Sequence, residues 1–182
     1  MRFFIGKGAK GTVFAILILL SMILTGCDDL PSDCLKYLDA PFLAEVKGEV
    51  DGGAVSALVY CDPTEHRTKE IYNKLTVTFL SPESLGGMTV SLRSDGKATL
   101  RLKDSEEELP LYSGLAEPYL ALSPEGEIYS QKKTADGYEI TYKQGEDSVT
   151  YYFDTSGTLK KAEGSVGGRK VLLEITKIRQ IK

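Results

Sequence analysis

Histidine is nearly missing from this 182-residue chain, in which His66 is the single example. Ser-His-Asp and Cys-His catalytic groups and histidine-rich zinc sites all depend on imidazole side chains. His66 stands in the charged segment 62–70 with no second ligand at helical or hairpin spacing, so we interpret it as a solvated loop residue. Phosphate-binding loops, paired Cys-x-x-Cys units and dinucleotide fingerprints are also missing. The sequence therefore predicts a protein that is not an enzyme and has no cofactor, and a hydrolase is the least favoured alternative.

The acidic run Asp104, Glu106, Glu107 and Glu108 is the second place where chemistry could reside. Clustered carboxylates bind Ca²⁺ or act as a paired acid and base. This run lacks the ligand spacing of an EF-hand loop and its central glycine. We interpret it as a solvated hairpin end and predict no metal site.

No apolar run in the sequence is long enough to span a membrane, because a membrane-spanning helix needs about 20 apolar residues. The longest run, residues 13–24, follows a segment with three cations and no acid, which is typical of a secretory signal peptide. Leu24-Thr25-Gly26-Cys27 resembles a bacterial lipobox. That resemblance implies a signal peptide over residues 1–26, cleavage before Cys27 and a diacylglyceryl thioether on Cys27. We expect a lipoprotein on the extracytoplasmic face of the cell membrane, and an uncleaved anchor is the alternative.

The mature part has an excess of negative charge. Removal of residues 1–26 takes away Arg2, Lys7 and Lys10, which leaves 19 Lys and Arg against 26 Asp and Glu, a net charge of −7. This balance argues against nucleic acid as a partner and against binding to anionic lipid headgroups by charge alone.

Only two further cysteines, Cys34 and Cys61, follow Cys27. Two cysteines in one small extracytoplasmic domain often form a disulfide, which here would join the N-terminal segment to an early strand. The alternative is a pair of reduced, buried thiols, because Cys61 lies on an apolar strand face.

Alternation of apolar and polar residues predicts a mainly β fold. A short helix over residues 32–39 precedes strands that alternate with period two, and turn signals recur about every ten residues after residue 125, as in an antiparallel meander. A second short helix is expected near 116–122, with Pro118 in its first turn. We expect about ten strands, in residues 42–50, 54–61, 71–79, 88–92, 98–102, 127–134, 138–142, 149–153, 158–165 and 171–175.

Two helices this short can cover only part of such a sheet. The sheet must therefore curl on itself, leave a groove or meet another molecule. We predict a curved antiparallel sheet or incomplete β-barrel with one or two short helices. The expected organisation is a signal peptide (1–26), a lipidated tether with a short helix (27–41) and a single β domain (42–182).

Residues 74–102, with 42–50 upstream and the apolar helical insert downstream, resemble the LolA/LolB-type half-barrel lipoproteins and carriers. The likeness lies in a strand, a turn at Ser81-Pro82, the Leu85-Gly86-Gly87 segment, a second strand and a hairpin. It is greatest to GerS-like germination lipoproteins of spore-forming bacteria. The resemblance implies an incomplete barrel around an apolar concavity, which holds lipid in the carriers. In the germination relatives it implies an adaptor for a cortex-processing amidase.

The leading hypothesis is a lipid-anchored lipoprotein whose curved sheet binds an apolar ligand or an envelope protein partner. The alternatives are the germination-type adaptor and a lipid or lipoprotein carrier, and a homodimer through a strand edge is also considered. The predicted ligand or partner face consists of Leu75, Val77, Phe79, Met88, Val90, Leu92, Leu100 and Leu102, covered by Leu115, Tyr119 and Leu120. These residues could equally be ordinary core.

Overall fold

The computed structural model describes residues 33–63, 71–103, 105–108, 113–124 and 126–181. Residues 31–182 belong to one compact unit, which contains all of the described helices and strands. The predicted signal peptide and the lipidation site Cys27 lie outside the described residues, as do His66 and Asp104.

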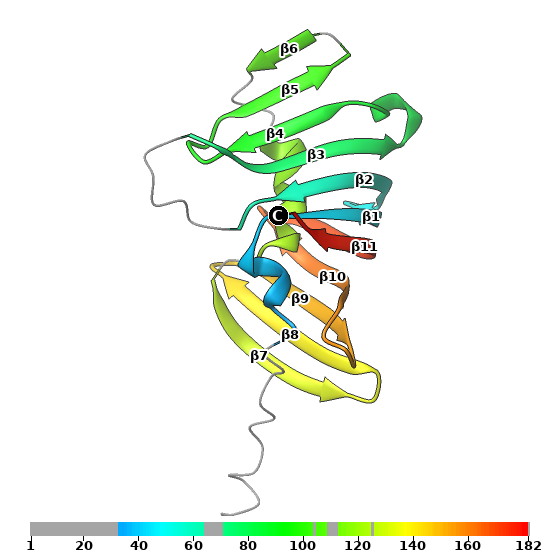
Figure 1. The fold of residues 1–182 in the computed structure, drawn as a ribbon, viewed down its shortest axis with the longest axis vertical. Helices are drawn as coiled ribbons and strands as arrows, with labels where there is room; N and C mark the ends of the chain where they lie inside the picture. The colour runs from blue at the N-terminus through cyan, green and yellow to red at the C-terminus, as the bar shows by residue number, and fades with distance from the viewer. Residues whose placement is uncertain (1–32, 64–70, 104, 109–112, 125, 182) are drawn as a thin grey trace, which may run out of the picture. The chain divides into compact units, whose positions relative to one another are not determined.

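The described residues form eleven antiparallel strands in one continuous sheet. The strands are β1 (Phe42–Val50), β2 (Gly53–Cys61), β3 (Asn73–Ser81), β4 (Thr89–Arg93), β5 (Ala98–Leu102), β6 (Ser105–Glu108), β7 (Glu127–Thr134), β8 (Gly137–Gln144), β9 (Asp147–Asp154), β10 (Leu159–Val166) and β11 (Arg169–Gln180). They lie in the order β6-β5-β4-β3-β2-β1-β11-β10-β9-β8-β7, and Figure 1 shows them fanning out from β6 to β7. Because β6 and β7 are both edges, the sheet is not closed into a barrel. The predicted fold class is confirmed.

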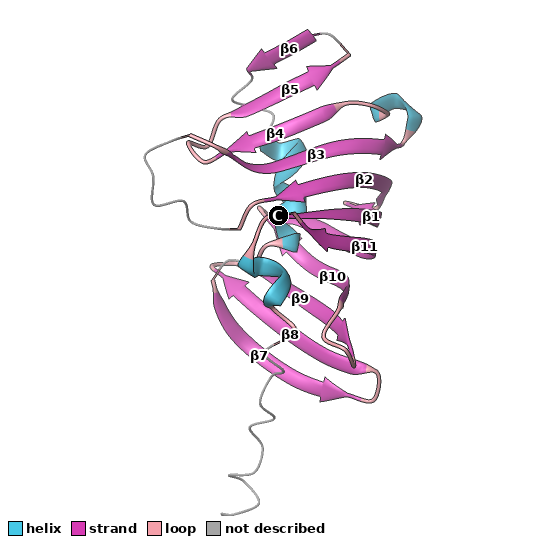
Figure 2. Cartoon of the chain, viewed as in Figure 1, coloured by secondary structure: helices cyan, strands magenta, loops and turns pink. Residues whose placement is uncertain are grey.

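All helical segments are short (Figure 2). Of the predicted helix over 32–39, the described residues form a single 3₁₀ turn, η1 (Lys36–Asp39), with Leu35 at its N-cap position. The predicted helix near 116–122 is confirmed as η3 (Glu117–Leu122), a 3₁₀ helix with Pro118 in its first turn, directly after α2 (Ser113–Ala116). A further 3₁₀ turn, η2 (Glu83–Leu85), follows β3.

Strand β6 is the element that the alternation did not predict. Its four residues, Ser-Glu-Glu-Glu, are all exposed and carry no apolar member. It pairs with β5 through contacts such as Thr99 opposite Glu108. The three glutamates of the acidic run are therefore exposed on an edge strand with one paired side, and Asp104 lies outside the described residues.

The alternation gives the sheet two different faces. Val59 and Val90 both lie opposite Val77 in the register, and directly opposed residues project to the same face. We call this the covered face, because η1 and η3 pack on it through Tyr37 beside Phe42 and Tyr119 beside Phe79. The opposite, outer face bears polar residues such as Thr76 and Ser91 between the same apolar positions.

Two meanders are joined where β1 meets β11, over nine residue pairs from Phe42–Gln180 to Val50–Val171. Gly48 makes this approach possible, because a Cβ atom there would overlap the carbonyl group of Leu172. The strands next to the junction are buried along their covered face, and their fully buried residues include Phe42, Val46, Val59, Val77, Leu173 and Ala162. The core is thus centred on the middle strands, while both edges remain open.

Candidate functional site

The α2–η3 segment is the main cover of the sheet. Tyr119 packs edge-to-face on Phe79 of β3, with the ring centroids 5.9 Å apart, and it is 1% exposed. The hydroxyl of Tyr37 in η1 donates a hydrogen bond to the carbonyl oxygen of Leu122, 3.1 Å away. These contacts bring η1 and η3 together over the middle of the covered face. The α2–η3 segment is too short to extend from there to either edge strand.

An apolar cleft of about 190 Å³ remains at one end of this cover. It lies where the β1–β2 turn, η2 and the α2–η3 segment meet. Its apolar walls are formed by Val50, Val55, Phe79, Pro82, Leu85 and Leu115. Apolar pockets with a few converging polar groups are the usual form of a small-molecule site.

Two polar side chains, Tyr119 and Arg169, also line this cleft. The hydroxyl of Tyr119 is buried and has no hydrogen-bond partner within the described residues. Burial raises the pKa of Tyr119 to about 12, although the charge of Arg169 acts in the opposite direction. The hydroxyl therefore stays protonated at neutral pH, as a donor without an acceptor.

Arg169 is fixed by two hydrogen bonds. Its Nε donates to Oδ2 of Asp51 at 2.7 Å, and its Nη1 donates to the carbonyl oxygen of Gly114 at 2.5 Å. Asp51 also accepts from the backbone amide of Lys170 at 2.9 Å, and these bonds lower the pKa of Asp51. The guanidinium consequently links the β1–β2 turn, β11 and α2 at the polar end of the cleft.

The structure brings most of the predicted face together. Leu75, Val77, Phe79, Met88, Val90 and Leu92 are all buried on the covered face, as is Tyr119 in the cover. Leu115 and Leu120 belong to the cover but are only half-buried. Most of these residues are core, and among them Phe79, Leu115 and Tyr119 also line the cleft.

The predicted face is less covered at its β5 end. Leu100 lies opposite Val90 in the register but is only half-buried, and Leu102 is 49% exposed. Both are near the open edge, beyond the short cover. They therefore do not form part of an enclosed concave surface.

Cys34 and Cys61 are both buried as thiols and are not joined in a disulfide. The expected bridge is therefore not present, and the alternative of two reduced cysteines describes the structure. Burial, with the nearby charges of Asp33 and Asp154, raises the pKa of Cys34. This thiol is accordingly a packing residue with low nucleophilicity at neutral pH.

Metal ligands do not gather in the part of the chain that the structure describes. No group of three or more His, Cys, Asp or Glu side chains is arranged there to hold a metal ion. Likewise, none of the described helices is long and apolar enough to cross a membrane.

Sequence reasoning missed Arg169 and the residues of the β1–β2 end of the cleft. Arg169 begins a strand after Gly167-Gly168 and reads as an ordinary exposed turn residue. Asp51 and Gly114, its partners, are 118 and 55 residues away along the chain. No local pattern in the sequence marks such a contact.

No family model and no curated protein matches the chain. Among solved structures, it is similar to an uncharacterized conserved protein from Thermus thermophilus, at 15% identity and a TM-score of 0.45, over 82% of this chain and 84% of that one. It is also similar to the LolA superfamily protein NE2245 from Nitrosomonas europaea, at 10% identity and a TM-score of 0.39, over 84% and 94%. These likenesses are weak and concern the fold alone.

Proposed function

We propose that this protein is a lipid-anchored, extracytoplasmic and non-enzymatic binding protein that takes an apolar ligand with a polar head. The observation that carries this proposal is the apolar cleft lined by Tyr119 and Arg169, in which the Tyr119 hydroxyl is buried and has no hydrogen-bond partner within the described residues. The lipobox-like segment that ends at Cys27 supports the anchoring, and the scarcity of histidine supports a role without catalysis.

The Tyr119 hydroxyl has no partner among the residues that the structure describes, which makes an empty cleft unfavourable. A buried donor without an acceptor costs about 1–3 kcal/mol. A ligand that places an oxygen acceptor at the Tyr119 hydroxyl and the Arg169 guanidinium would remove that penalty, while its apolar part contacts Phe79 and Leu115. The polar head would thus set the orientation of the ligand, and the apolar walls would bury the apolar surface of the ligand.

The size of the cleft limits the ligand. Its volume of about 190 Å³ is below the roughly 300–1,000 Å³ of sites that enclose drug-sized ligands. One acyl chain, partly inserted, fits better than a lipid with several chains. A carrier that encloses a complete lipoprotein anchor is therefore less favoured than a protein that binds a single-chain amphiphile.

A soluble chain that begins at residue 28 tests the proposal by mass spectrometry of its organic extract. We expect a co-purified single-chain amphiphile, which is reduced in Tyr119→Phe and Arg169→Ala but unchanged in Leu80→Ala, a substitution on the outer face. An extract with no amphiphile, together with no binding of a fluorescent fatty acid, would contradict the proposal.

The β7 edge favours a second candidate, an adaptor that binds an envelope protein. Seven of its eight residues are exposed, including Ile128 at 48% and Tyr129 at 73% exposure. A partner strand could add to this edge through backbone hydrogen bonds. Crosslinking in cells should then join the protein to one partner, either an envelope protein such as the amidase implied by the resemblance or a second copy. Ile128→Lys should abolish that product, and a monomer with no crosslinked neighbour would exclude this role.

A further inference from the structure

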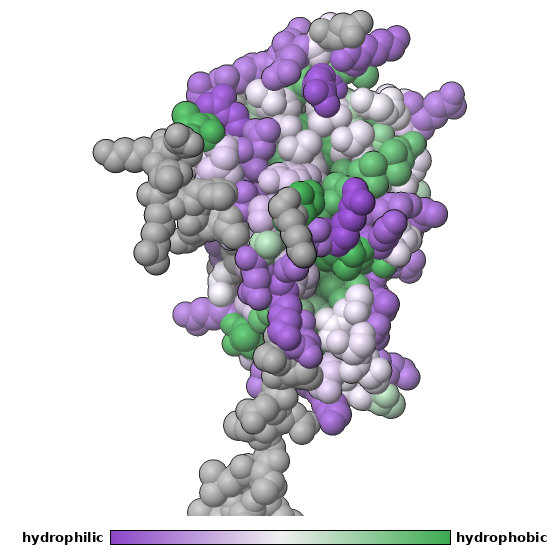
Figure 3. Space-filling model, in the orientation of Figure 1, coloured by the Kyte–Doolittle hydropathy of each residue, from purple (hydrophilic) through white to green (hydrophobic). Residues whose placement is uncertain are grey.

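The outer face carries a polar groove of about 330 Å³ across β3, β4, β5 and β6. It lies on the side of the sheet opposite the apolar cleft, and none of its lining residues belongs to that cleft. The side chains that matter for the argument are Asn73, Thr76, Ser91, Thr99, Arg101 and Glu106. Figure 3 shows hydrophilic residues spread over much of the surface in view.

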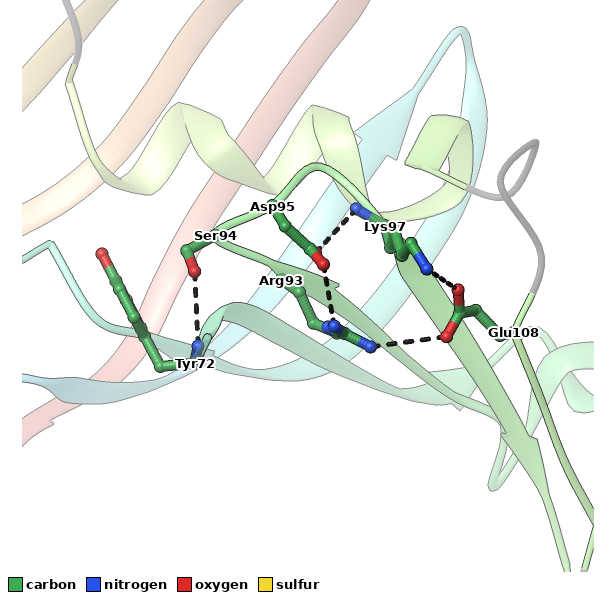
Figure 4. A network of polar contacts seen from close by, with 6 residues as sticks. All are labelled: Tyr72, Arg93, Ser94, Asp95, Lys97 and Glu108. Carbon is green, nitrogen blue, oxygen red and sulfur yellow. Dashed lines mark hydrogen bonds and ion pairs between the residues drawn. The ribbon is translucent and has the colours of Figure 1, made fainter. Parts of the chain in front are cut away.

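One wall of the groove is held by an ion-pair network (Figure 4). Arg93 contacts Asp95 at 2.8 Å and Glu108 at 3.4 Å, and Lys97 reaches Glu108 at 2.6 Å. The network therefore ties the β4–β5 turn to the β6 edge. Ser94 extends it to the start of β3, because its hydroxyl accepts a hydrogen bond from the amide of Tyr72 at 3.3 Å.

The network leaves one donor unused. Nη1 and Nη2 of Arg93 are occupied, but Nε is buried and has no partner within the described residues. Buried polar groups are nearly always hydrogen-bonded, to water or ligand if not to protein. Arg93 also lines the groove, so this unsatisfied donor belongs to a residue of the groove wall.

Further along the groove, Arg101 and Glu106 lie opposite each other in the register of β5 and β6. No ion pair joins them, although both are charged, and neither has a hydrogen bond to another described side chain. The groove consequently offers the donors of the Arg101 guanidinium beside the acceptor oxygens of the Glu106 carboxylate. The charges of this pair sum to zero.

The remaining lining is rich in hydroxyl groups. Thr76 and Ser91 share a hydrogen bond of 3.0 Å, and Thr89 shares one of 3.1 Å with Thr78. Each hydroxyl has one donor and two acceptor positions, so capacity remains after these bonds. Asn73 and Thr99 have no side-chain bond to another described residue.

The mixture of free donors and acceptors selects the ligand class. A simple anion would satisfy Arg101 but would be repelled by Glu106, and an apolar ligand would leave all of these groups unpaired. A ligand with many hydroxyls can accept from Arg101 and Asn73 and donate to Glu106 at the same time. We propose that this groove is a binding site for an oligosaccharide, separate from the apolar cleft and independent of the function proposed for it.

Saturation-transfer difference NMR on the full chain in a zwitterionic, sugar-free detergent tests this proposal, because the method reports weak binding by signals of the ligand. The probes are chitotetraose, maltotetraose and glycerol phosphate, each titrated to about 10 mM. We expect transfer to at least one oligosaccharide and none to glycerol phosphate. Arg101→Ala and Glu106→Gln should each weaken binding about tenfold, as expected for the loss of a hydrogen bond to a charged group.

The chain supplies a matched control in Thr141 and Thr150, which form a hydroxyl pair of 2.9 Å between β8 and β9, outside the groove. Thr150→Val should leave the transfer unchanged. No transfer to either oligosaccharide would overturn the proposal, as would transfer that persists in both Arg101→Ala and Glu106→Gln. Binding of glycerol phosphate alone would identify an anion site and would also overturn it. The folding of every variant is checked by its thermal unfolding midpoint.

Discussion

Arg169 at the start of β11 donates a hydrogen bond through Nη1 to the carbonyl oxygen of Gly114 in α2, 2.5 Å away. This bond joins the sheet directly to its cover. We expect Arg169→Ala to destabilise the protein by about 1.5–3 kcal/mol, the usual range for a hydrogen bond to a charged group. Amide hydrogen exchange should rise in residues 113–122 more than elsewhere. A uniform rise across the sheet would show that Arg169 does not hold the cover.

Tyr119→Phe removes the hydroxyl that has no partner and keeps the ring that packs on Phe79. We expect this variant to be more stable than the wild type by about 1 kcal/mol at neutral pH when no ligand is bound. It should bind the apolar ligand more weakly, because the head loses a donor. Urea unfolding of delipidated protein measures the first effect, and a loss of stability would show that the hydroxyl has a partner in solution.

The same hydroxyl predicts an alkaline effect. The pKa of Tyr119 is raised from 10.0 to about 12 in the folded protein. Between these two values the unfolded chain loses a proton that the folded chain keeps, so stability falls as pH rises through this window. The wild type should lose roughly 2 kcal/mol more than Tyr119→Phe there. The free energy of unfolding of both proteins is measured between pH 9 and about 12. If it changed with pH equally in both, the raised pKa of Tyr119 would be contradicted.

Asp154 predicts an effect at acid pH. Its carboxylate accepts hydrogen bonds from the hydroxyl of Ser156 at 2.6 Å and the amide of Thr158 at 3.0 Å, and Lys160 lies 3.0 Å away. These contacts, led by the Ser156 hydroxyl, lower its pKa. Its stabilising contribution is therefore present above the unfolded pKa of about 3.9 and is lost as pH falls below it. The stability gap between wild type and Asp154→Asn should narrow from pH 7 to about 3; a constant gap would exclude this role.

Leu122 tests whether the short cover contributes to the core. It is 0% exposed, so Leu122→Ala should cost about 2–5 kcal/mol through lost burial and a cavity. Leu80 on the outer face of β3 is 47% exposed, and Leu80→Ala should change stability by no more than about 0.5 kcal/mol. Urea unfolding measures the loss of stability in each of the two variants. Equal effects would mean that η3 is not packed on the sheet as described.

The strands with clear alternation were predictable from the sequence because burial of one face is a local property of each strand. Residues 42–50 were predicted as a strand with the bounds that β1 has, and the hairpin expected between the strands over 88–92 and 98–102 connects β4 and β5. Strand β6 was not predictable, because Ser105–Glu108 has no apolar residue and pairs only along the sheet edge.

The two proposed binding sites were far less predictable than the strands. Tyr119 and Phe79 were named as part of a face, but the cleft also depends on Val50, Pro82 and Arg169, which come from three other segments. The groove on the outer face was missed entirely. Its Thr and Ser residues read as the solvated half of alternating strands, and only the register places them beside Arg101 and Glu106.

By itself, the sequence determined most of the strands and the turns between them, because each of these depends on neighbouring residues. The lipid anchor at Cys27 stays a prediction from the sequence, since Cys27 lies outside the described residues. Only the tertiary structure decided that β1 pairs with β11, since alternation is the same whichever strand lies alongside. That pairing places Arg169 next to Asp51, and docking of the cover places it next to Gly114 and the Tyr119 cleft. Contacts between residues more than fifty positions apart arise from packing of the whole sheet, and no local pattern encodes them.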